Sequence, residues 1–302
     1  MAILENLSLC LVIANKSLIA YALDIVVLKP NAPESSSSAY QAPRKLSGAR
    51  NVSFFATADM NERTLIFYKE GNNRLSTFKV LETVFQTSRG EKSKLFRGLR
   101  PNSDEITELF RVCDEFYIPS ECYTINLFKK SIAISTQRGF ELLSLDRKVP
   151  MSIPDLKQAA ISASGARLAG QRPLGMFRVS DDEFLLCYEE CAVYVDRHGE
   201  ISRSLVPEFA GKAKTAAMYD MHLVLFHSDF VEVCNAQTGR LEQVIAGRDV
   251  RCLDFGVAAT GQDGQRTLKF TMEHPETADC QLVLEMVLNE TQRMNHSTGG
   301  IK

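Results

Sequence analysis

Short apolar runs separated by polar turns recur along this chain, and the clearest case lies within residues 180–199. Phe184 to Tyr188 is almost continuously apolar, and Ala192 to Val195 is largely β-branched or aromatic, as is typical of strands covered on both faces. The acidic pair Glu189-Glu190 separates the two runs, and His198-Gly199 supplies turn residues after the second. The pattern predicts a β-hairpin.

The same pattern recurs before and after this hairpin, in groups of three or four runs about 40 to 45 residues apart. One hairpin has open edges and buries too little surface to be stable alone, so a series of hairpins needs a closed or stacked architecture. We therefore predict an all-β protein, a β-propeller with about five or six recognisable blades. The predicted strands are Leu7–Ala14, Ser17–Leu23, Val52–Ala56, Leu65–Lys69, Leu75–Leu81, Tyr123–Phe128, Ser131–Thr136, Phe140–Leu145, Leu174–Arg178, Phe184–Tyr188, Ala192–Asp196, Ile201–Leu205, Thr215–Tyr219, His222–Phe226, Phe230–Cys234, Leu241–Ile245, Val250–Phe255, Leu268–Met272 and Leu282–Leu288.

Polar segments interrupt the strand pattern at three places. The segment at about 29–50 contains four consecutive serines and the segment at about 85–104 is rich in basic residues, so both are expected to be long loops. Residues 104–116 combine a helical spacing of apolar residues with a strand-like end, and we favour a strand from about Leu109 onward. Residues 289–302 are a polar tail, which leaves one propeller domain over residues 1–288.

Composition and charge narrow the class of protein. With 302 residues, 45% hydrophobic residues and a formal net charge of −2, the chain can bury a large core but has no overall attraction to nucleic acid or an anionic membrane. Its eight cysteines are scattered, as free thiols in a reducing compartment are. No charged leader precedes an apolar segment, and the run from Leu7 to Ile13 is too short to span a membrane. We expect a cytoplasmic protein without a transmembrane segment.

Catalytic and metal sites are not predicted. The chain has no G-x-S-x-G, no H-E-x-x-H and no phosphate-cradling glycine motif. Cys187 and Cys191 are the closest cysteines, but no second pair follows at the spacing of a zinc site. The adjacent carboxylates Asp181-Asp182 and Glu189-Glu190 lie in predicted turns, where both side chains of a pair are expected to point into water. We therefore expect a non-catalytic protein without a metal or cofactor.

Surface recognition is the chemistry that remains, because rigid blades hold the loops of a propeller in fixed positions. Residues 89–100 carry five basic residues against a single acid, Glu91. We interpret this cluster as a solvated loop; the alternative is contact with an acidic partner or with phosphoinositide head groups. The candidate partner-contact residues are Arg89, Lys92, Lys94, Arg97, Arg100, Arg138 and Arg248, together with the aromatic residues Tyr40 and Tyr123.

Three sequence blocks, residues 116–146, 183–203 and 206–253, carry a resemblance to a known family. In this order they resemble the citron homology (CNH) domain. In the last block, Glu232 and the triplet Thr238-Gly239-Arg240 precede Gln243-Val244-Ile245 and Arg251-Cys252. That block is most similar to the version that ends fungal Rho-type guanine-nucleotide exchange factors.

The resemblance implies a seven-bladed propeller of WD40-like type with a protein-interaction role. In such exchange factors the catalytic Dbl-homology and pleckstrin-homology modules precede this domain, and nothing in this chain resembles them. The first hypothesis is a non-catalytic regulatory propeller that binds a Rho GTPase or a cortical scaffold in fungal cell-wall signalling. The alternatives are the propeller of a vesicle-tethering or vacuolar-sorting subunit and a propeller enzyme acting on a glycan or phosphoester.

Residues 1–23 resemble a point already inside the family domain, so the N-terminal blade is expected to be incomplete. A propeller lacks a long open edge only when its last blade closes against strands from the other terminus. We expect the hairpin Leu7 to Leu23 and the strands Leu268 to Met272 and Leu282 to Leu288 to flank a gap. Residues upstream of Met1 are then expected to raise the melting temperature and suppress self-association through strand addition.

Overall fold

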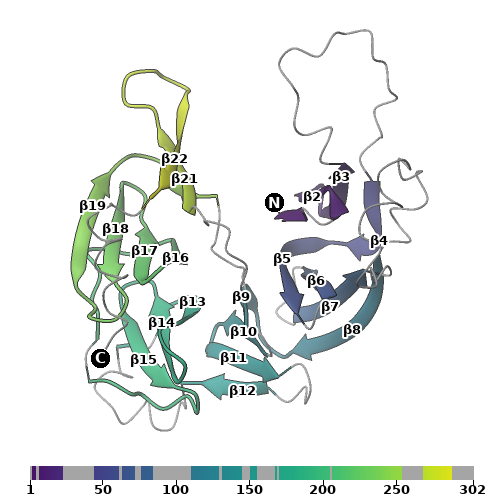
Figure 1. The fold of residues 1–302 in the computed structure, drawn as a ribbon, viewed down its shortest axis with the longest axis horizontal. Coiled ribbons are helices and arrows are strands. Elements are labelled where there is room, and N and C mark those ends of the chain that lie inside the picture. Colours follow the sequence, from purple (N-terminus) through teal and green to yellow (C-terminus); the bar gives the residue numbers. More distant parts are fainter. Residues whose placement is uncertain are drawn as a thin grey trace, which may run out of the picture. The chain divides into compact units, whose positions relative to one another are not determined.

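The computed structural model describes residues 2–4, 7–22, 44–60, 63–71, 76–83, 110–128, 131–144, 150–154, 167–168, 170–204, 206–253 and 268–287. They contain 22 strands and no α-helix. The strands form six sheets (Figure 1). Within each sheet, strands that are consecutive in the sequence are hydrogen-bonded to one another. The chain divides into two compact units, residues 1–138 with 143–149 and residues 139–142 with 150–302.

Two four-stranded sheets belong to the first unit, and their strands run in the order of the sequence. The first sheet consists of β1 (Ala2–Leu4), β2 (Leu9–Ala14), β3 (Ser17–Ala22) and β4 (Arg44–Arg50), and the second of β5 (Val52–Met60), β6 (Arg63–Glu70), β7 (Ser76–Thr83) and β8 (Phe110–Ile118). Between β2 and β3, Asn15 and Lys16 have positive φ angles of 50° and 57°, as the tight turn of a two-residue hairpin requires. Leu11, Ile66 and Tyr68 lie in the core that these sheets share.

A further four-stranded sheet has the order β12-β11-β10-β9. Its strands are β9 (Cys122–Leu127), β10 (Ser131–Thr136), β11 (Gly139–Ser144) and β12 (Pro150–Ile153). Gly139, at the β10–β11 turn, has a φ of 123°, a conformation that other residues rarely adopt. A Cβ added there would also lie 3.0 Å from the carbonyl oxygen of Ile153, so the turn requires glycine on both grounds.

Three more sheets belong to the second unit. They consist of β13 (Pro173–Arg178), β14 (Glu183–Tyr188) and β15 (Ala192–Asp196); of β16 (Thr215–Tyr219), β17 (His222–Phe226), β18 (Phe230–Asn235) and β19 (Leu241–Ala246); and of β20 (Arg251–Cys252), β21 (Leu268–Glu273) and β22 (Gln281–Met286). Alternate residues of β17 enter two different cores. Leu223 and Leu225 pack with residues of β13–β15, whereas Val224 and Phe226 pack with residues of β20–β22.

The predicted fold class, all-β with blade-like groups of strands, is confirmed. Six sheets are compatible with the expected seven-bladed architecture in which one blade is incomplete. The hairpin of residues 180–199 is present as β14 and β15, with Cys187 opposite Ala192. The strand expected from about Leu109 is present as β8.

The structure corrects two sequence expectations. Ile201–Leu205 was expected to be a strand, but its described residues form only an isolated bridge between Val195 and Ile201. The segment still contacts β15 through separate hydrogen bonds, such as Ser202 N to Tyr194 O at 2.9 Å, and the Ser202 hydroxyl donates to Glu183. Conversely, residues 44–50, assigned to a loop, form β4.

Strand β4 was missed because its sequence, RKLSGAR, is mostly polar and contains a glycine. It pairs with β3 as the outer strand of the sheet, with Arg50 opposite Ser17, and thereby buries Leu46 and Ala49 in the core of the first unit. Strands β1 and β12 were also missed, because three or four residues are too short to show a pattern. Most of both expected long loops, the expected tail and the positions of Leu23 and Leu288 lie outside the described residues.

Candidate partner-binding site

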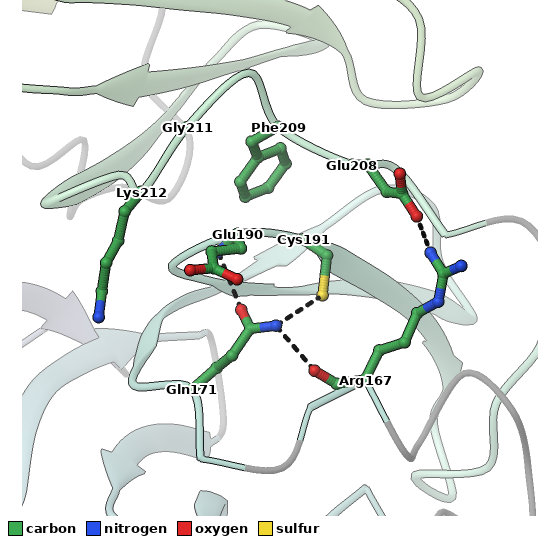
Figure 2. A pocket seen from close by; sticks show the side chains of 8 residues that line it. All are labelled: Arg167, Gln171, Glu190, Cys191, Glu208, Phe209, Gly211 and Lys212. Atoms are coloured by element: carbon green, nitrogen blue, oxygen red, sulfur yellow. Dashed lines mark hydrogen bonds and ion pairs between the residues drawn. The ribbon is translucent and has the colours of Figure 1, made fainter.

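A pocket of about 450 Å³ lies in the second unit, at one end of the sheet β13–β15 (Figure 2). It is open to solvent and has charged, polar and aromatic walls. The eight residues that line it are Arg167, Gln171, Glu190, Cys191, Glu208, Phe209, Gly211 and Lys212.

The strand register explains why these residues meet. Pro173, which begins β13, lies opposite Tyr188, which ends β14, so the segment before β13 adjoins the β14–β15 turn. The segment 206–214, which leads into β16, is held against the same turn by backbone hydrogen bonds. Phe209 N donates to Glu190 O at 3.0 Å, and Ala213 N donates to Glu189 O at 2.7 Å.

Gln171 fixes the floor of the pocket. Its Nε2 donates to the Arg167 carbonyl at 2.7 Å and to the Cys191 Sγ at 3.5 Å, and its Oε1 accepts from Glu190 N at 2.9 Å. Both polar ends of this side chain are therefore satisfied, and it links the segment before β13 to the turn. The Cys191 thiol below is 3% exposed, and burial raises its pKa above the ordinary value, so it is a neutral wall rather than a nucleophile.

Both basic residues that line the pocket form ion pairs with glutamates. Arg167 bonds to Glu208 at one end of the pocket. At the other end Lys212 Nζ lies 3.0 Å from Glu189 Oε2, and Arg172 Nε lies 3.3 Å from Glu189 Oε1. Burial raises the pKa of Glu189, but the hydrogen bonds and charges of Lys212 and Arg172 outweigh burial, and the pKa lies below its usual value.

The Glu189-Glu190 turn therefore departs from the sequence prediction for one of its two residues. Both side chains were expected to point into water, but the side chain of Glu189 is 12% exposed and bound by two cations. Glu190 is exposed as predicted, and its carboxylate makes no hydrogen bond or ion pair with any residue that the structure describes. Asp181 and Asp182 point into water as predicted.

A buried carboxylate supports the wall of the pocket from behind. Glu232 on β18 is 2% exposed, and it accepts from Ala210 N at 3.0 Å and contacts His227 Nε2 at 3.2 Å. The His227 ring stacks on Phe230 with centroids 4.0 Å apart. These contacts hold the segment carrying Phe209 and Gly211 against the sheet β16–β19.

None of the residues predicted from the sequence as partner contacts lines this pocket. Arg138 lies in the turn between β10 and β11, and Arg248 lies between β19 and β20; both are exposed. Tyr123 on β9 is partly buried. The remaining candidates, Arg89, Lys92, Lys94, Arg97, Arg100 and Tyr40, lie outside the described residues.

Over the described parts of the chain, no group of three or more His, Cys, Asp or Glu side chains is arranged to hold a metal ion. All eight cysteines are free; five of them are buried, one is partly buried and two are exposed. Within the same described residues, no helix has the length and apolarity needed to cross a bilayer.

The consecutive antiparallel sheets, with a pocket formed by loops at the end of one of them, define a protein of the β-propeller class. The CNH domain family model matches residues 1–256, and the chain therefore belongs to the CNH domain family. A solved structure, "AfRom2 CNH domain", is similar to it with a TM-score of 0.71 and 22% sequence identity, over 95% of this chain and 79% of that chain.

Curated relatives come from fungi. The chain is 29% identical over 245 residues to Rho1 guanine nucleotide exchange factor 3 of Schizosaccharomyces pombe, covering 78% of this chain and 19% of the relative. It is 28% identical over 265 residues to Rho1 guanine nucleotide exchange factor 1 of the same organism, covering 87% and 19%. It is 24% identical over 254 residues to RHO1 GDP-GTP exchange protein 2 of Saccharomyces cerevisiae, covering 83% and 17%. The chain thus spans about a fifth of the length of these relatives.

Proposed function

We propose that this chain is the non-catalytic regulatory propeller of a Rho-type guanine-nucleotide exchange factor. It binds a Rho-family GTPase or a scaffold protein at the cell cortex and acts in fungal cell-wall signalling. The observation that carries the proposal is the similarity to several fungal Rho1 exchange factors over most of this chain. We assign the exchange reaction itself to other parts of such proteins, because this chain corresponds to about a fifth of their length.

A pull-down with the immobilised chain tests the binding role. The chain is incubated with a fungal Rho1-type GTPase in its nucleotide-free, GDP-bound and GTP-analogue-bound states, and separately with cortical scaffold proteins. We expect saturable binding of at least one of these, and no binding of a Ras-type GTPase, which serves as the matched control. An intact domain that binds no Rho GTPase and no scaffold contradicts the proposal. In the same samples, nucleotide release from the GTPase is expected to be no faster with the chain than without it.

The basic cluster Arg89, Lys92, Lys94, Arg97 and Arg100 is our candidate for contact with an acidic partner or with phosphoinositide head groups. Replacing all five by glutamine should weaken such binding by about tenfold or more at low salt, because each cation near an anionic surface contributes about 1 kcal/mol. Replacing Arg138 and Arg248 instead tests the other predicted contacts. Unchanged binding to vesicles with and without phosphoinositide, and to protein partners, refutes the role of the cluster.

A further inference from the structure

The pocket at the end of β13–β15 has one charged group that the protein leaves unpaired. Arg167 is engaged by Glu208 and Lys212 by Glu189, so both cations of the lining already have anionic partners. The carboxylate of Glu190 has no such partner among the described residues. Among the charged side chains of the lining, Glu190 is therefore the one without an ion-pair partner in the described part of the chain.

An aromatic residue, Phe209, lines the same pocket as this carboxylate. Figure 2 shows the Phe209 side chain directed from its segment toward the turn that carries Glu190 and Cys191. The ring is partly buried against the core between β13–β15 and β16–β19, which fixes its position. A cation over an aromatic face gains electrostatic attraction from the ring, and a cation beside a carboxylate gains a charge-assisted hydrogen bond.

We propose that this pocket binds an arginine side chain presented by a protein partner. The guanidinium donates to the Glu190 carboxylate and stacks on the Phe209 ring, and its aliphatic stem lies along Gly211. A planar guanidinium can stack and donate at its edge at the same time, which the ammonium group of lysine cannot do. Gln171 and the Glu232 contact to Ala210 hydrogen-bond two walls of the pocket to the sheets behind them, and such pre-organisation lowers the cost of ordering on binding.

The inference rests on the proposed function only in assigning the arginine to a protein partner. Its chemistry is tested on the whole 302-residue chain, labelled with ¹⁵N and observed by transverse-relaxation-optimised NMR. The probe is the blocked peptide acetyl-Gly-Gly-Arg-Gly-Gly-amide. The matched control peptide carries citrulline in place of arginine, which keeps the shape and removes the charge.

We expect the arginine peptide to shift the amide signals of Glu190, Cys191, Phe209 and Gly211 in a saturable manner. The citrulline peptide should bind at least about tenfold more weakly, because a hydrogen bond between two charged groups is stronger than one with a neutral donor. Glu190→Gln should weaken binding of the arginine peptide by a similar factor, and Phe209→Leu should weaken it by about threefold. Glu285→Gln, an exposed carboxylate on β22, should have no effect.

Equal binding of the two peptides, unchanged binding by Glu190→Gln, or shifts confined to other residues overturns the inference. Because the carboxylate of Glu190 has no partner to lose among the described residues, its variant should give the parent spectrum outside the pocket. The two proposals fail separately. Arginine binding in a chain that binds no Rho GTPase or scaffold refutes only the function, whereas GTPase or scaffold binding without arginine-peptide binding refutes only the pocket.

Discussion

The sheets β16–β19 and β20–β22 share a core but differ in how many of their faces are covered. In β17 every residue is buried, and successive residues enter different cores: Leu225 packs toward β13–β15 and Phe226 toward β20–β22. In β22 burial alternates. Leu282 and Leu284 pack into the shared core, whereas Val283 is 68% exposed.

The difference shows how an apolar run in the sequence relates to the burial of a strand. A strand covered on both faces reads as continuously apolar, and a strand covered on one face alternates. The sequence of β22, QLVLEM, has a valine at a position whose side chain is exposed, so hydropathy alone would class it with β17. The two strands can be told apart by experiment, because the same substitution should have very different effects in each.

The largest expected effect follows from truncating the centre of the shared core. Phe226→Ala removes a fully buried ring that contacts Phe270 at a centroid distance of 5.7 Å. We expect the free energy of unfolding to fall by about 3–5 kcal/mol, measured by urea denaturation, because both the burial and the packing around a cavity are lost. A loss below about 1 kcal/mol would mean that the two sheets do not share this core in solution.

The second-largest effect is expected for a buried carboxylate in β16–β19, compared with an exposed carboxylate in β20–β22. Glu232→Gln in β18 keeps the shape of the side chain but removes the charge that His227 and Ala210 contact, and we expect a loss of about 1–3 kcal/mol. Hydrogen exchange of the Ala210 amide should accelerate. The control is Glu285→Gln in β22, whose side chain is exposed and should change stability by less than about 0.5 kcal/mol. Equal effects of the two variants would refute the structural role of Glu232.

The contact between the β14–β15 region and the turn between β18 and β19 is expected to depend on pH. Arg203 pairs with Glu183 and also donates to the Gln237 carbonyl, while Tyr194 donates to the Ala236 carbonyl at 3.0 Å. Burial raises the pKa of Glu183, but the hydrogen bonds from Arg203 and Ser202 outweigh it, and the pKa lies below the ordinary value of 4.5.

Because the folded pKa is depressed, the unfolded state binds more protons, and the stabilisation is present above pH 4.5 and lost as the pH falls through the folded pKa. Glu183→Gln should therefore cost about 1 kcal/mol at pH 7 and nothing at strongly acidic pH. Thermal unfolding of both proteins across this range measures the difference. A difference that stays constant with pH would contradict the ion pair.

Much of the fold could be predicted because its strands are local. Runs such as His222–Phe226 are marked by hydropathy and bounded by turn residues, and they pair with their neighbours in the chain. Polar β4 and the segment 201–204 could not be predicted correctly. In both, the outcome depends on contacts with a neighbouring strand, namely β3 for β4 and β15 for residues 201–204, and on side-chain contacts such as Arg203 with Glu183.

The candidate pocket could be predicted only in part. The Glu189-Glu190 turn was visible in the sequence, but its two carboxylates receive different partners, because Lys212 and Arg172 reach one and not the other. Phe209 reads as an isolated aromatic residue in a connector. Its position depends on the long-range backbone bond to Glu190, which no local pattern reports.

Val283→Thr has the smallest expected effect, and together with Val224→Thr it is the sharpest test of the comparison, because the same substitution is made in both strands. Val224 in β17 is 0% exposed and Val283 in β22 is 68% exposed. Val→Thr changes shape little but adds a hydroxyl group, which costs about 1–3 kcal/mol where it is buried without a partner. We expect Val224→Thr to lower the free energy of unfolding by that amount and Val283→Thr to change it by less than about 0.5 kcal/mol. Threonine suits a strand as well as valine does, so strand propensity does not obscure the result. If Val283→Thr destabilises the chain as much as Val224→Thr does, that face of β22 is covered in solution, and the contrast between the two sheets is wrong.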